Sequence, residues 1–148
     1  MIDFLKSIFS GQDVDDGAEH EELQVAVCAV LLEVAHSNDH VTSEEEQRID
    51  HLIEKYFHLT DADLNELKKK ATAARENSVD LYYFTKTIRQ NYSIEEREKV
   101  LDMMWKVVYA DGEIDKYEES ICRRLTDLIG LEHQHYMKSK LKIAKMKH

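Results

Sequence analysis

The sequence contains no proline and only four glycines in 148 residues, so the residues that most often end helices are nearly absent. Glu, Lys, Leu and Ala, which favour helices, are abundant. We find no segment that alternates polar and apolar residues as a half-buried strand does. Long helices are therefore permitted along the chain, and we predict an all-α fold.

The length is typical of one domain and is sufficient to bury a core without disulfides or a structural metal. We therefore treat residues 1–148 as a single helical domain. The hydrophobic content of 43% is too high for a disordered chain. Cys28 and Cys122 lie in helical apolar patterns, where a free thiol behaves as a small hydrophobe, so we expect a reduced, cytoplasmic protein.

The net charge of −10 would repel phosphate backbones over most of the surface, so we do not expect a nucleic-acid partner. The last helix is rich in lysines, which suit its C-terminal dipole: Lys138, Lys140, Lys142, Lys145 and Lys147. The longest apolar stretch, Val25 to Leu32, is far shorter than the roughly 20 residues that cross a bilayer. We therefore expect no transmembrane helix.

The N-terminal region combines a short apolar segment with an acidic one. Apolar residues recur there at helical spacing: Ile2, Leu5, Ile8 and Phe9. An acidic run, Gly11 to Glu22, follows and is predicted to interrupt the helix. We expect residues 1–20 to be a peripheral helix and acidic segment that packs on the body, with weak contact to a membrane surface or a second copy as alternatives.

Two segments are apolar enough to be central helices. One runs from Glu21 to His36 and is apolar nearly all round; the other follows Ser93 and contains Trp105, which we predict to be a core residue. Three Ser, Thr or Asp residues precede a Glu at capping-box spacing: Thr42 with Glu45, Ser93 with Glu96, and Asp115 with Glu118. Asp61 is predicted to cap a shorter helix, and further helices are predicted from about Val79 to Arg89 and after Gly130. A compact bundle of about seven or eight helices results.

The chain contains an internal repeat. Leu31 to Ile49 and Met104 to Cys122 match in residue type without a gap. We assign residues 21–74 to the first repeat and residues 93–142 to the second. Each copy needs a partner to cover its apolar face, so the two central helices should pack together with the other helices outside.

The turn of the second repeat carries a family resemblance. Residues 110–115, Ala-Asp-Gly-Glu-Ile-Asp, followed by Glu118, resemble the signature of the TerB-like family, named for a tellurite-resistance protein. The first repeat carries a degenerate version with Asn38, Asp39 and His40. The resemblance spans roughly Leu23 to Lys142. It implies an all-helical bacterial protein related to stress and tellurite-resistance systems, with acidic loops that are candidates for metal binding and no established enzymatic activity.

The second loop concentrates carboxylates that hard cations such as Ca²⁺ and Mg²⁺ prefer. The candidate ligands are Asp111, Glu113, Asp115, Glu118 and Glu119. The loop is not an EF-hand, because it lacks glycine at the sixth position and glutamate at the twelfth. A purely structural explanation is also open, in which Gly112 forms the turn, Ile114 enters the core, Asp115 caps the helix and Glu118 completes the box.

The first loop offers Asp39, His40 and Glu45, where the imidazole nitrogen would also suit zinc or another transition ion. His133 and His135 are two positions apart on a helix, so their side chains diverge and we expect them on the surface.

Catalytic motifs are missing from the sequence. We find no nucleophile beside a base, no Gly-rich phosphate loop and no paired Cys motif, and His36 with Asp39 is a weak acid–base candidate. We therefore predict a non-enzymatic domain whose acidic loops bind a divalent cation or an unidentified protein partner. The alternative is a metal-dependent hydrolase that uses the same carboxylates.

Overall fold

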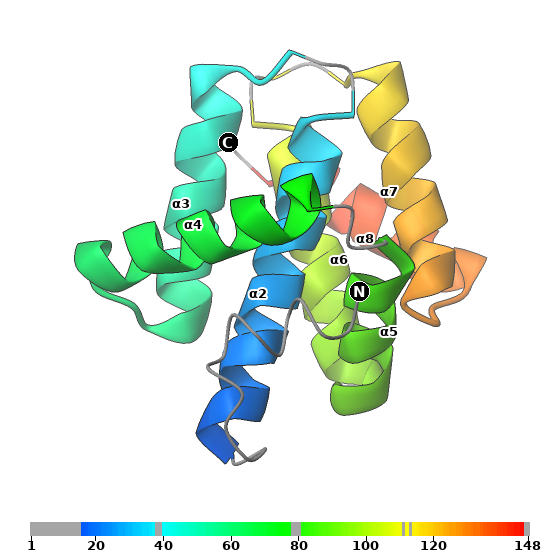
Figure 1. Cartoon of the computed structure of the whole chain (residues 1–148). Helices are drawn as coiled ribbons and strands as arrows, with labels where there is room; N and C mark the ends of the chain where they lie inside the picture. Colours follow the sequence, from blue (N-terminus) through cyan, green and yellow to red (C-terminus); the bar gives the residue numbers. More distant parts are fainter. Residues whose placement is uncertain (1–15, 38–39, 78–80, 111, 113, 147–148) are drawn as a thin grey trace.

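The computed structural model describes residues 16–37, 40–77, 81–110, 112 and 114–146. Within them it contains α-helices and no strand, which confirms the predicted all-α class (Figure 1). The helices are α2 (Asp16–Ala35), α3 (Ser43–Phe57), α4 (Asp61–Glu76), α5 (Leu81–Asn91), α6 (Ile94–Val108), α7 (Lys116–Leu128) and α8 (His133–Ala144). The helix predicted over residues 2–9 lies outside the described residues.

The start of α2 differs from the prediction. The helix begins at Asp16, five residues before Glu21, so the later half of the acidic run Gly11 to Glu22 is helical. Ala and Glu favour helices, and the acidic run contains both, so the helix extends into it. The predicted interruption between residues 2–9 and α2 lies outside the described residues.

Helix α2 is the centre of the fold, as its all-round apolar sequence predicts. Every residue from Val25 to Leu32 is buried, and the helix contacts α3, α4, α5, α6 and α7. Burial of each Leu or Val side chain contributes roughly 1.5–3 kcal/mol. The ion pair between Arg75 of α4 and Glu33 of α2, at 3.2 Å, adds a polar contact at the edge of this interface.

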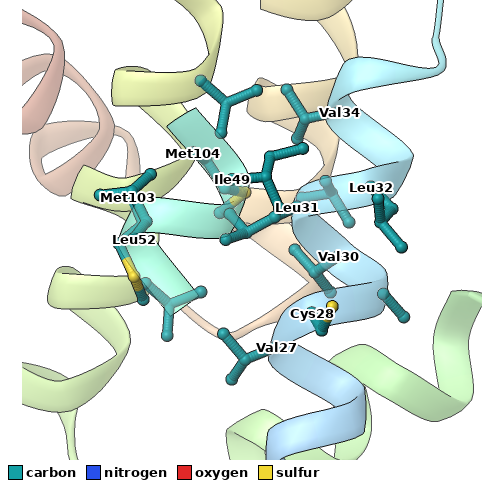
Figure 2. Close-up of a cluster of buried hydrophobic side chains, with 14 of the residues drawn as sticks. Val27, Cys28, Val30, Leu31, Leu32, Val34, Ile49, Leu52, Met103 and Met104 are labelled. Atoms are coloured by element: carbon teal, nitrogen blue, oxygen red, sulfur yellow. The ribbon is translucent and has the colours of Figure 1, made fainter. Parts of the chain in front are cut away.

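Helix α6 is the second central helix and contacts α2, α3, α7 and α8. Trp105 is fully buried, which confirms its predicted core position, and its ring lies 5.1 Å from that of Tyr136 on α8. Figure 2 shows Leu31 of α2, Ile49 of α3 and Met104 of α6 in one apolar cluster. The two repeats therefore share a single core.

The two central helices pack together as predicted, and they run in the same direction (Figure 1). The α2–α3 and α6–α7 connections consequently lie at the same end of the bundle. Contacts also cross between the repeats, because α3 packs on α6 and α2 packs on α7. This arrangement places both acidic loops on one end of the molecule.

The prediction that Ile114 enters the core is wrong, since 48% of this residue is exposed. Helix α7 begins only at Lys116, after the Asp115 cap, so Ile114 lies in the loop and the inward-facing stripe of α7 does not extend to it. Its counterpart in the first repeat, Val41, is half-buried and packs against the core.

Candidate functional site

The second acidic loop joins α6 to α7, and its structure is set by the cap of α7. Asp115 Oδ1 accepts hydrogen bonds from the backbone amides of Tyr117, at 2.8 Å, and Glu118, at 3.1 Å. Gly112 adopts a positive φ of 84°, which glycine tolerates in a tight turn. Asp111 and Glu113 lie outside the described residues. The predicted cap at Asp115 is thus confirmed.

Glu118 and Glu119 are adjacent in α7 but occupy different environments. Glu118 is only 2% exposed. Glu119 forms a 2.8 Å ion pair with Lys140 of α8, in which both side chains are mostly buried. This ion pair directs Glu119 towards α8, and its role as a ligand stays a prediction.

The first acidic loop joins α2 to α3 and ends in a complete capping box. The Thr42 amide donates to Glu45 Oε1 at 3.0 Å, and the Glu45 amide donates to Thr42 Oγ1 at 3.1 Å. Thr42 Oγ1 also donates to Glu45 Oε1 at 3.2 Å. His40 is exposed, and Asp39 lies outside the described residues.

Glu45 is only 1% exposed, and its second carboxylate oxygen, Oε2, has no hydrogen-bond partner among the described residues. Carboxylates are rarely buried to this degree unless they are paired or coordinate a metal, because burial removes the water that stabilises the charge. The N-terminus of α3 supplies part of the compensation through its dipole. The remaining oxygen is chemically suited to a cation.

His36, at the C-terminal side of α2, belongs to the same region. Partial burial lowers the pKa of its imidazole, and the nearby Arg75 guanidinium lowers it further, while Glu33, Glu46 and Glu45 act in the opposite direction. The net lowering favours the neutral imidazole. The predicted acid–base pair of His36 with Asp39 stays a prediction, because Asp39 lies outside the described residues.

Each predicted ligand set includes a residue of undescribed position: Asp39 in the first loop, and Asp111 and Glu113 in the second. Among the residues whose positions are described, no three His, Cys, Asp or Glu side chains gather as a metal site would require. Cavities lie between α3 and α6, between α6 and α8, on α4, and between α2 and α4, and none of the predicted ligands lines them.

Comparison with known families identifies the chain. Residues 24–141 match the model of the family described as tellurite resistance protein TerB, and this range includes both acidic loops and nearly all of both predicted repeats. The chain belongs to the TerB family. No curated protein and no solved structure gives a significant match. The predicted resemblance is thus confirmed, and it extends over most of the helical domain.

The helices of the TerB domain also bear on the membrane predictions. No helix in the described part of the chain is both long and apolar enough to span a bilayer. The predicted contact of residues 1–20 with a membrane surface or a second copy remains a prediction.

Sequence reasoning missed the burial of Glu45 and Glu118. A signal for it was present, because Glu45 precedes Ile49 and Leu52 at helical spacing, and Glu118 precedes Cys122 and Leu125 in the same way. All four apolar residues are buried, so each glutamate continues the inward stripe of its helix.

Proposed function

We propose that this TerB domain is a non-enzymatic module of the tellurite-resistance type that binds a divalent cation through its two acidic loops. The observation that carries the proposal is the burial of two repeat-related carboxylates, Glu45 and Glu118, at the same end of the bundle. Carboxylates that face away from water are stabilised when a cation replaces the lost hydration.

The ligand chemistry favours a hard cation. Glu45 Oε1 already accepts two hydrogen bonds from Thr42, which leaves Oε2 for another positive partner. Carboxylate oxygens suit Ca²⁺ and Mg²⁺ better than softer ions, and both ions retain waters or accept further carboxylates. Asp39 in the first loop, and Asp111 and Glu113 in the second, would complete the oxygen set in this proposal. His40 would be required only for a transition ion such as Zn²⁺.

Such a module would couple ion binding to the relative position of the repeats. Glu45 lies at the start of α3, which packs on α6, and Glu118 lies in α7, which packs on α2. A cation at this end would stabilise the folded state by about 2.7 kcal/mol at a concentration 100 times its dissociation constant. It would also change the charge presented to a protein partner there.

Calorimetric titration of the metal-stripped full chain with Ca²⁺, Mg²⁺, Mn²⁺ and Zn²⁺ tests the proposal. We expect saturable binding of Ca²⁺ or Mg²⁺ that is lost in Glu45→Gln and Glu118→Gln. Glutamine keeps the size and an acceptor oxygen but removes the charge.

Glu96→Gln is the matched control, because Glu96 occupies the same capping-box position in α6, away from the two loops. If no ion binds, or if Glu96→Gln weakens binding as much as Glu45→Gln does, then the buried glutamates serve only as helix caps.

A further inference from the structure

A groove between α3 and α6 has an apolar floor. It encloses about 190 Å³, and its floor is formed by Leu52, Tyr56 and Met103. Leu52 and Met103 are 8% and 5% exposed, and Figure 2 shows them side by side. The TerB family assignment and the proposed cation site do not account for this feature, because the groove lies along the bundle and shares no residue with the acidic loops.

The rim of the groove is positively charged in a protein whose net charge is −10. It contains Lys55, Lys99 and Lys106, none of which forms an ion pair with a residue whose position is described. The one acidic residue of the lining, Asp102, is engaged by α8, since its carboxylate lies 2.8 Å from Lys142 Nζ and accepts a hydrogen bond from Ser139 at 2.5 Å. Three lysine charges thus surround the floor with no ion-pair partner in the described part of the chain.

The size of the groove indicates what kind of ligand it takes. Pockets for small-molecule ligands usually enclose about 300–1,000 Å³, which is more than this groove offers. A groove of this size instead suits one or two bulky apolar side chains from an amphipathic segment laid along two helices. The lysines require that such a segment also carry acidic residues.

We infer that the occupant is the N-terminal segment of the same chain, residues 2–15. Its sequence has both required properties, with an apolar stripe followed by carboxylates: Ile2, Leu5, Ile8 and Phe9, then Asp13 and Asp15. The apolar side chains would cover the floor formed by Leu52 and Met103, and the aspartates would neutralise the lysine rim.

The segment starts close enough to reach the groove. The His20 ring, near the start of α2, lies 6.1 Å from the Phe57 ring at the end of α3, and Phe57 is adjacent to Tyr56 of the groove. An extended chain spans about 3.3–3.6 Å per residue, so residues 2–15 can extend beyond the full length of α3. The covalent tether provides an effective concentration on the order of millimolar, so a weak contact is enough to fill the groove.

The test uses the full chain with a nitroxide attached at Ser10→Cys and with ¹³C-labelled methionine methyl groups. Cys28 and Cys122 are fully buried, so the label reacts with the introduced thiol alone. We expect the Met103 methyl signal to lose intensity at low salt and to recover it in 1 M NaCl, where the screening length falls from about 10 Å at 0.1 M to about 3 Å.

Matched charge variants separate docking from chance proximity. The triple variant Lys55→Gln, Lys99→Gln, Lys106→Gln should restore the Met103 signal. The control Lys69→Gln, Lys116→Gln, Lys145→Gln removes the same charge from exposed positions outside the groove and should leave the signal weak.

Two outcomes would overturn the inference. One is a Met103 signal that keeps its intensity at low salt or responds equally to both triple variants. The other is an equal loss of the signal when ¹³C-labelled chains without the nitroxide are mixed with nitroxide-labelled chains, which would make the occupant a second copy.

Discussion

Glu45 and Glu118 occupy equivalent positions in the two repeats, each in the first turn of the helix that follows an acidic loop, and both side chains are buried. The same offset relates Leu31 to Met104 in the predicted internal repeat. Because α2 and α6 run in the same direction, the two glutamates are presented at one end of the bundle (Figure 1). This end of the bundle therefore carries a pair of carboxylates shielded from water.

The capping box of α3 should contribute measurably to stability. Thr42→Ala removes the hydroxyl that caps the Glu45 amide and that donates to Glu45 Oε1. We expect the free energy of unfolding to fall by about 1 kcal/mol, measured by urea denaturation. Thr42→Ser keeps the hydroxyl, so its free energy of unfolding should fall much less. An equal fall in both variants would show that the threonine methyl group, and not the cap, provides this stability.

The shared core should respond strongly to truncation. Leu31 of α2 is fully buried, so Leu31→Ala should lower the free energy of unfolding by about 2–5 kcal/mol. Leu141 of α8 is 54% exposed, so Leu141→Ala should change the free energy of unfolding by about 0.5 kcal/mol or less. Urea denaturation of both variants measures the difference. Comparable losses would contradict the placement of α2 at the centre.

The two glycines with positive φ should differ in their tolerance of a side chain. Gly130 follows α7 at a φ of 78°, and a Cβ there would lie 2.8 Å from Arg89 Cδ and 2.8 Å from Arg97 Nη1. Arg97 donates to the carbonyl oxygens of Ile129 and Gly130, both at 3.1 Å, so its displacement would also disturb the end of α7.

Gly112 has a φ of 84°, and a Cβ added there would meet no atom of the described residues within 4 Å, so Gly112→Ala incurs only the backbone strain of roughly 1–2 kcal/mol. Thermal unfolding should therefore show a larger loss for Gly130→Ala. The reverse order would contradict the contacts of Arg97 with the end of α7.

The buried thiols should make stability fall at alkaline pH. Burial raises the pKa of the Cys28 thiol to about 12 and also raises that of Cys122, whereas an exposed thiol titrates near 8.5. The folded state thus keeps protons that the unfolded chain loses, so this stabilisation is complete below the unfolded pKa and declines as pH rises above it.

We expect a decline of about 1.4 kcal/mol per pH unit for each cysteine between about pH 9 and pH 10, below the usual pKa of tyrosine. Urea denaturation across this range should give a smaller slope for the Cys28→Ala, Cys122→Ala double variant. Equal slopes would show that the thiols do not account for the decline.

The sequence was sufficient to predict the helical class and the caps at Thr42, Ser93 and Asp115, because each follows from local chemistry. The predicted cap at Asp61 is wrong, since Thr60 caps α4. The absence of proline permits long helices, and the Thr42–Glu45 spacing defines a capping box that the structure contains. The all-round apolar sequence of α2 likewise requires a central position.

Other features depended on tertiary packing and could not be derived from local patterns. The direction of α6 relative to α2 decides whether the acidic loops meet at one end, and no local signal specifies it. Ile114 looked like a core residue because it is apolar, yet its position before the Asp115 cap leaves it exposed. The engagement of Glu119 by Lys140 joins residues on two helices, which spacing within α7 does not reveal.

The most direct measurement is an amide NMR titration of the metal-stripped full chain with Ca²⁺ and with Mg²⁺. We expect the amides of Thr42 and Glu45 in the first loop, and of Asp115 and Glu118 in the second, to shift saturably with one of the ions while those of Ser93 and Glu96 do not. Unchanged amides in both loops at millimolar ion would contradict cation binding at this end and would leave Glu45 and Glu118 with a structural role alone.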